Sequence, residues 1–131
     1  MKMLVRALTL VLCMIFIPAS LALNPGVQAG ATVAGIYDNF TVGKGSGDLE
    51  GMRVVIVPAG GGYYAIVQIA QGGAEDPKPV FVEATVKGMN VSFAAGDEKF
   101  TGTATAAGLR LKNSAGESQV LKRKPCSSYF K

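Results

Sequence analysis

From residue 32 onward, short stretches rich in Val, Ile, Thr, Phe and Tyr alternate with clusters of Gly and other turn-forming residues. In 80–87, small or branched apolar side chains occupy every second position, and Phe81, Glu83, Thr85 and Lys87 occupy the positions between them. A period of two places alternate side chains on opposite faces of a strand, so that one face is buried and the other meets solvent. The pattern predicts strands at 32–42, 49–57, 63–70, 80–87, 89–95, 99–106, 109–112 and 119–124.

The segments between these strands have the composition of tight turns. Segments 43–48, 58–62 and 72–77 all contain glycines, which adopt positive φ without strain. Short strands joined in sequence by such turns suggest an antiparallel meander, and closing a meander into a barrel removes its exposed edges. We therefore predict an all-β fold, a small antiparallel up-and-down β-barrel of about eight strands.

The same alternation predicts which residues fill the barrel. The inward positions of the strands at 80–87, 89–95 and 99–106 include Val82, Val86, Val91, Phe93, Phe100 and Ala104. Between them lie the small residues Ala84 and Gly102, which either accommodate the phenyl rings or leave dry space for an apolar guest. Because the strands are short, we expect a mostly filled interior with a shallow mouth.

Residues 1–22 have the three parts of a secretory signal peptide. Lys2 and Arg6 provide a basic start, and residues 7–17 form an apolar run of eleven residues. Residues 19–22 then supply the small side chains that a cleavage site requires. An apolar run of this length is too short for a membrane-spanning helix, which needs about 20 residues.

Cleavage after residue 22 would start the exported protein at Leu23, and a second possible site would start it at Gly30. We expect residues 23–131 to form a single β-barrel domain that is periplasmic or secreted, without stable membrane insertion. A bacterial, periplasmic origin is the simplest interpretation.

The composition argues against catalysis and metal binding. The chain contains no His and no Trp, so nucleophile systems that use a His base are excluded and the commonest zinc ligand is missing. Of the two cysteines, only Cys126 survives cleavage, and it has no His to activate it. We expect an inert thiol in a monomer, with a Cys126-linked dimer as the alternative, and neither a catalytic residue, a metal nor a cofactor.

Charge gives little indication of a partner. Residues 122–131 carry Lys122, Arg123, Lys124 and Lys131, which we interpret as solubilising residues near a chain end. Because the exported chain lacks a wider basic face in its sequence, we do not expect it to bind nucleic acid.

Two further patterns have ordinary explanations. The Gly-x-Gly-x-Gly sequence in 43–48 is not followed by a helix, which a phosphate-binding loop requires, so it is interpreted as a hairpin loop. Asp38, Asp48 and Glu50 could converge as a carboxylate cluster, but acids beside turns are usually solvated.

Aromatic residues are the best candidates for ligand or partner contact. Tyr63 and Tyr64 are adjacent in one predicted strand and therefore face opposite ways. Phe81 lies opposite the Val80 and Val82 face and is expected to point outward. We expect residues 125–131 to cover it; the alternative is that this outward aromatic, beside strands that are apolar on both faces, forms a contact patch.

Two short motifs give the chain a family resemblance. Gly35-Ile36-Tyr37 on the first predicted strand and Leu121-Lys122-Arg123 on the last resemble the arrangement in calycins, the lipocalin, fatty-acid-binding protein and avidin group. Lipocalins and fatty-acid-binding proteins have Gly-x-Trp on strand one and stack a late Arg across that ring to close one end of the barrel. The resemblance implies that Tyr37 and Arg123 form such a cation–π contact here. The chain departs from the family in having Tyr for Trp and no helix after the barrel, and it lacks the tryptophans on which avidins depend.

The expected function follows from this fold. A calycin-like barrel implies an exported, non-enzymatic binding protein for a small apolar or amphipathic ligand. The alternative is a protein-binding module, such as an inhibitor or immunity protein against a cell-envelope hydrolase. A cavity of about 300 Å³ or more inside the barrel would favour the first, and a filled interior with an exposed apolar patch the second.

Overall fold

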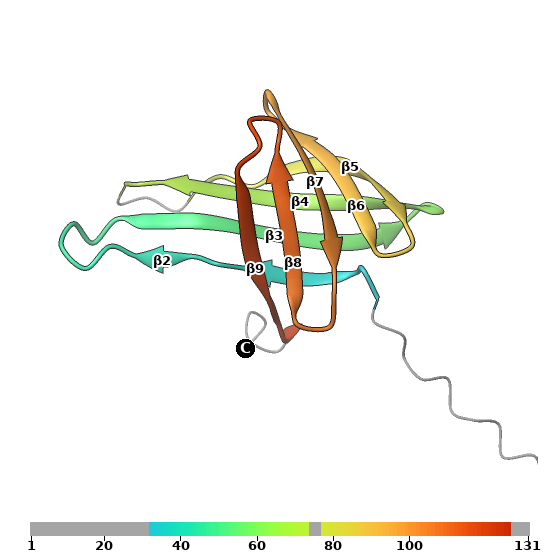
Figure 1. Cartoon of the computed structure of the whole chain (residues 1–131), viewed down its shortest axis with the longest axis horizontal. Helices are drawn as coiled ribbons and strands as arrows, with labels where there is room; N and C mark the ends of the chain where they lie inside the picture. The colour runs from blue at the N-terminus through green and yellow to red at the C-terminus, as the bar shows by residue number, and fades with distance from the viewer. Residues whose placement is uncertain (1–31, 74–76, 127–131) are drawn as a thin grey trace, which may run out of the picture.

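The computed structural model describes residues 32–73 and 77–126, and this part of the chain is a closed antiparallel β-barrel (Figure 1). Its strands are β1 (Gly35–Asp38), β2 (Thr41–Val42), β3 (Leu49–Ala59), β4 (Gly62–Gln71), β5 (Val80–Lys87), β6 (Asn90–Ala95), β7 (Glu98–Ala104), β8 (Gly108–Asn113) and β9 (Ser118–Lys124). The predicted signal peptide and both predicted mature N-termini lie outside the described residues.

Every strand from β3 to β9 pairs with its neighbour in sequence, and β1 pairs with both β9 and β3. These pairings close a ring of eight strands, and β2 lies outside it, beside the start of β3. The predicted all-β, up-and-down antiparallel barrel is therefore confirmed. In Figure 1, β1, β3 and β4 run across the direction of β7, β8 and β9, so the barrel is formed by two crossing layers.

The strand predicted at 32–42 is divided into β1 and β2, and Asn39 explains the division. The backbone N–H of Asn39 donates to the Met52 carbonyl over 3.1 Å, whereas the Met52 N–H donates to the Asn39 side-chain oxygen over 2.7 Å. A side chain thus replaces one backbone acceptor of the ladder. The residue next to Asn39 on β3, Gly51, must be a glycine, because it has a φ of 113° and a Cβ there would lie 2.8 Å from the Asn39 carbonyl oxygen.

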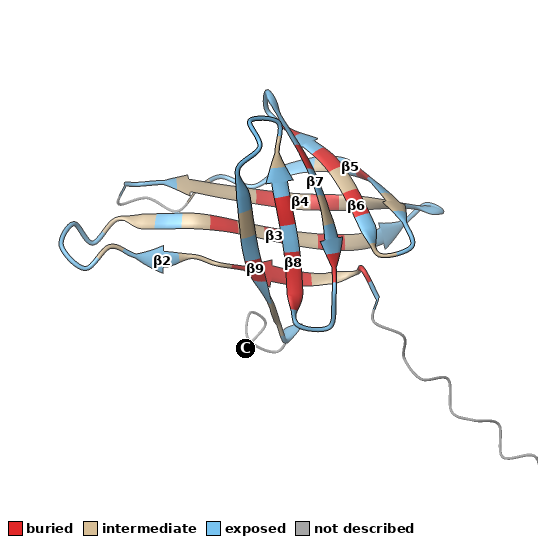
Figure 2. Cartoon of the chain, in the orientation of Figure 1, coloured by how far each residue is buried: buried red, intermediate tan, exposed pale blue. Residues whose placement is uncertain are grey.

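Buried and exposed positions alternate along the strands, as Figure 2 shows for β8. The predicted inward residues Val91, Phe93, Phe100 and Ala104 are all buried. Val82 and Val86 are half-buried and pack against the core. The rings of Phe93 and Phe100 stack with their centroids 5.4 Å apart.

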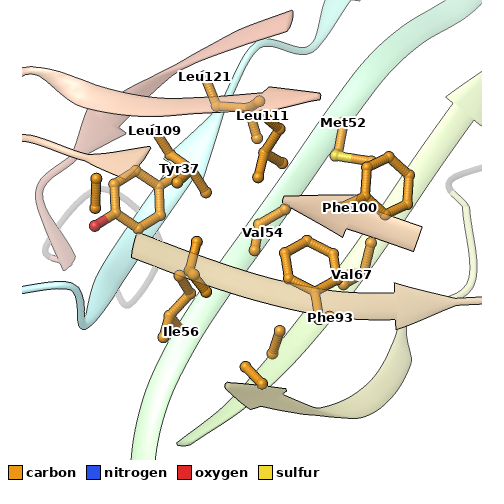
Figure 3. Close-up of a cluster of buried hydrophobic side chains, with 14 of the residues drawn as sticks. Tyr37, Met52, Val54, Ile56, Val67, Phe93, Phe100, Leu109, Leu111 and Leu121 are labelled. Atoms are coloured by element: carbon orange, nitrogen blue, oxygen red, sulfur yellow. The ribbon is translucent and has the colours of Figure 1, made fainter. Parts of the chain in front are cut away.

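The barrel interior is a packed core. Its largest fully buried side chains, each less than 2% exposed, are Tyr37, Phe100, Met52, Ile56, Leu109, Leu111, Leu121, Val54 and Val67. In Figure 3, Tyr37 lies at one end of this cluster, and Met52 and Phe100 lie at the other. Gly102 does not leave space for a guest, because a methyl group there would collide with the backbone carbonyl oxygen of Arg110 on the neighbouring strand.

Candidate functional site

The outer side of β1, β3, β4 and β5 carries a continuous row of apolar side chains. Ile36 pairs with Val55, Val55 with Ile66, and Ile66 with Phe81. Directly paired residues on one face of a sheet have Cβ atoms about 5 Å apart, so the four side chains are successive neighbours across four strands. Alternate residues of the same strands, such as Val54 and Val67, point into the core instead. Successive residues of β3 and β4 therefore point alternately inward and outward, but both sides of these strands are apolar.

Phe81 is the most exposed member of this row, with 64% of its surface accessible. Its ring stacks on that of Tyr64, with centroids 5.0 Å apart and planes inclined by 10°. We expected residues 125–131 to cover Phe81. Residues 125 and 126, the described part of this segment, leave it exposed, and residues 127–131 lie outside the described residues. We use the name apolar outer face for the set Ile36, Val55, Val57, Tyr64, Ile66 and Phe81.

The three aromatic candidates are thus separated by the barrel wall. Tyr64 and Phe81 lie together outside, whereas Tyr63 is half-buried and packs against the core cluster. Tyr63 pairs with the buried Ala84, which confirms that the two tyrosines occupy opposite faces of β4. A single contact surface can include Tyr64 and Phe81.

A groove of about 540 Å³ lies along the apolar outer face. Ile36, Val55, Val57 and Ile66 line it, together with Cys126. The Cys126 thiol is exposed, so it is accessible to reagents and to a second thiol. The Cys126-linked dimer stays a prediction.

A polar network borders the apolar row on one side. Asp38, only 5% exposed, accepts hydrogen bonds from Arg53 Nε over 2.7 Å and from the Phe40 backbone N–H over 2.9 Å. Arg53 also donates to Gln68 over 3.4 Å, and its guanidinium lies 4.9 Å from the centre of the Phe40 ring. Asp38 is thus held in an ion pair with Arg53. The sequence alone does not reveal this pair, because the two residues meet only through the register of β1 on β3.

One end of the barrel is covered by Arg123, whose guanidinium lies 4.8 Å from the centre of the Tyr37 ring. The expected contact between these residues is therefore present. The guanidinium also donates to the Tyr37 hydroxyl over 2.7 Å and to the backbone carbonyls of Ala34, Thr32 and Thr105. Gly35 leaves room for it, since a Cβ there would lie 2.6 Å from Arg123 Nη1.

Burial raises the pKa of Tyr37 above its ordinary value of 10.0, and the adjacent Arg123 guanidinium opposes part of this shift through its charge and its hydrogen bond. Tyr37 therefore stays protonated through the physiological range. Its hydroxyl donates to the Val33 carbonyl over 2.7 Å, which fixes the chain before β1 against the core. Tyr37 is a structural residue in this arrangement.

Within residues 32–73 and 77–126, no group of three or more potential ligand side chains is placed to hold a metal ion. In the same ranges, no helix has the length and apolar character needed to cross a membrane. No family model, curated protein or solved structure matches this chain. Its function must therefore be argued from its own surfaces.

Proposed function

We propose that this protein is an exported, non-enzymatic binding module that contacts another protein through the apolar outer face. The observation that carries the proposal is the row formed by Val55, Ile66 and Phe81 outside a barrel whose interior is already filled, with Ile36, only 4% exposed, at the covered end of the row. A filled core provides no chamber for a guest. An exposed aromatic at the end of an apolar row is typical of a contact surface.

The surroundings of the row support a protein partner. Protein interfaces combine an apolar centre, enriched in aromatic residues and Arg, with a polar rim. Here Arg53 and Gln68 border the row on one side, and Tyr64 and Glu83 border it on the other. Because Arg53 is already held by Asp38, its position is fixed before any partner binds, which lowers the entropy cost of association.

The groove supports a second candidate, a small apolar or amphipathic ligand bound outside the barrel. Its volume of about 540 Å³ lies within the range of about 300–1,000 Å³ that is usual for ligand sites. This candidate keeps the ligand class expected from a calycin-like barrel but moves the ligand from the interior to the groove.

The calycin-like assignment and the export route belong to the same proposal. The closed ring of eight strands and the Tyr37–Arg123 contact support a distant likeness to calycins. A periplasmic or secreted location would bring the apolar outer face into contact with cell-envelope proteins. An inhibitor or immunity protein against a cell-envelope hydrolase fits this combination.

Site-specific photo-crosslinking in the producing cell tests the proposal. A photoreactive phenylalanine derivative at position 81 should yield one discrete protein adduct. The same derivative at Val120, which is 57% exposed on β9, should not. Phe81→Asp should weaken binding of the captured partner by about 30-fold or more, as expected for an interface hot spot.

Native mass spectrometry of the protein from its own host separates the two candidates. A bound small molecule that is detected with the wild-type protein and lost in an Ile66→Asp variant would establish a groove ligand in place of a protein partner. Equal crosslinking at positions 81 and 120, with no retained mass, would exclude both.

A further inference from the structure

The outer side of β5 to β9 has a chemistry opposite to that of the apolar outer face. One row runs across it through the paired residues Lys87, Asn90, Thr103, Arg110 and Val120. The row beside it contains Thr85, Ser92, Thr101, Lys112 and Ser118. Hydroxyl, amide and cationic side chains therefore cover this side almost throughout.

Two neighbouring clefts lie on this surface and share Thr103. One, of about 430 Å³, is lined by residues of β5, β6 and β7 that include Lys87 and Asn90. The other, of about 740 Å³, is lined by residues from β7, β8, β9 and the turn between β7 and β8, and these include Arg110 and Lys122. No acidic residue lines either cleft. We call the combined surface the basic face and define it by Lys87, Asn90, Thr103, Thr105, Arg110 and Lys122.

The cations of the basic face are available to a ligand. Within the described part of the chain, the side chains of Lys87, Arg110 and Lys122 form neither an ion pair nor a hydrogen bond. Arg123 also lines the second cleft, but its guanidinium is engaged by Tyr37 and backbone carbonyls. Lys87 and Arg110 have no carboxylate among the residues directly paired with them, and Lys122 is paired with Asp38, whose carboxylate is already held by Arg53.

We propose that the basic face binds an acidic polysaccharide, a polyhydroxylated chain with carboxylate or phosphate substituents. Lys87, Arg110 and Lys122 would pair with the anionic groups through charge-assisted hydrogen bonds. The Thr103 hydroxyl donates to Asn90 over 2.9 Å, which leaves its oxygen as an acceptor and the Asn90 amide N–H groups as donors for sugar hydroxyls, whereas the Thr105 hydroxyl is engaged by Gly108. This inference is independent of the proposed protein partner, because the two faces share only β5, where Phe81 and Lys87 lie near opposite ends, and because their chemistry is opposite.

The spacing of the cations favours an extended ligand over a single anion. Lys87 and Arg110 are separated by three inter-strand steps, which amount to about 14 Å. Lys122 lies diagonally from Arg110 on the adjacent strand, about 7–8 Å away. One small anion can contact only a part of this set, whereas a chain with repeated charges can contact all of it.

The absence of aromatic residues from the lining of both clefts favours the polysaccharide over single-stranded nucleic acid, a membrane or a second protein. Single-stranded nucleic acids are held largely by stacking of bases on aromatic rings. Protein segments that bind a membrane surface combine basic residues with Trp, Phe or Leu side chains that enter the lipid. Protein interfaces are also enriched in aromatic residues. Hydroxyls and cations without rings suit a hydrated, hydroxyl-rich chain.

Calorimetric titration of the exported protein with polygalacturonate, a linear polyuronate, tests the inference. We expect binding that weakens between about 50 mM and about 200 mM salt, as for other polyanions, and no binding to the neutral polymer dextran. The double variant Arg110→Glu/Lys122→Glu should lose affinity by about 30-fold or more. The matched control is Lys44→Glu/Lys78→Glu, which changes the net charge equally at exposed positions away from the basic face. It should lose less than about threefold.

Four outcomes would overturn the inference. The first is no binding of polygalacturonate at low salt, and the second is an equal loss in both double variants, which would indicate an unspecific charge effect. The third is tighter binding of duplex DNA than of polygalacturonate with the same sensitivity to Arg110→Glu/Lys122→Glu, which would assign the face to nucleic acid. The fourth is tighter binding of phosphatidylglycerol vesicles than of polygalacturonate with the same sensitivity to Arg110→Glu/Lys122→Glu, which would assign the basic face to a lipid surface.

Discussion

Arg123 lies over the ring of Tyr37 and donates a hydrogen bond to its hydroxyl, although 86 positions separate the two residues in sequence. The same guanidinium binds the carbonyls of Thr32, Ala34 and Thr105. One side chain therefore ties the segment before β1 to the end of β7 across β9. This geometry makes Arg123 a closing residue of the barrel and leads to the first three predictions.

Replacing Arg123 with Ala should destabilise the protein by about 2 kcal/mol, because the cation–π contact and several hydrogen bonds are lost together. Lys122→Ala is the matched control, since Lys122 is exposed and points outward, and it should cost less than about 0.5 kcal/mol. Chemical denaturation of both variants measures the difference. Equal free energies of unfolding would show that Arg123 does not close the barrel.

Gly35→Ala should destabilise by about 1–2 kcal/mol, because the added methyl group would displace the guanidinium of Arg123 from its place over Tyr37. Gly45→Ala is the control, since a Cβ at Gly45 meets nothing within 4 Å. Thermal unfolding of the two variants should give a lower Tm for the first only. If Gly35→Ala has no effect after Arg123→Ala is introduced, the two residues act through the same contact.

Stability should decrease as the pH rises above 10.0, because folding raises the pKa of Tyr37 above this ordinary value. The folded protein then holds the phenolic proton more tightly than the unfolded chain does. The contribution is complete below pH 10.0 and is lost as the pH rises through the folded-state pKa. Denaturant titrations on either side of this pH should show the decrease. A Tyr37→Phe variant with an unchanged pH dependence would contradict the assignment.

Ala104→Phe should destabilise by about 1–3 kcal/mol or more, because Ala104 is only 1% exposed in a filled interior and the larger ring would overpack it. Ala94→Phe, at an exposed position on β6, should change stability by less than about 0.5 kcal/mol. A tolerated Ala104→Phe would instead indicate an open interior. In that case the ligand site belongs inside the barrel.

Export can be checked by N-terminal sequencing of the protein recovered outside the cytoplasm. We expect the chain to begin at Leu23, or at Gly30 if the second site is used. Recovery of the intact chain from Met1 in the membrane fraction would refute cleavage and the predicted location.

Most strands, and the faces of those whose polarity alternates, could be predicted from the sequence because both depend on local properties, whereas the division of 32–42 into β1 and β2 could not. A period of two assigns Phe93 and Phe100 to one face whatever their neighbours are, and positive φ at Gly88 and Gly96 is a property of single residues at turns. The contact between Tyr37 and Arg123 came instead from a family resemblance carried by two short motifs.

Which outward residues meet depends on how distant strands pair. Asp38 and Arg53 form an ion pair, and Ile36, Val55, Ile66 and Phe81 form one row, because β1, β3, β4 and β5 pair in a particular register. The unpaired cations of the basic face were likewise scattered along the sequence from Lys87 to Lys122. Register and core filling are set by packing between distant segments, where a shift of one residue would exchange the two faces of a strand. No local pattern in the sequence contains that information.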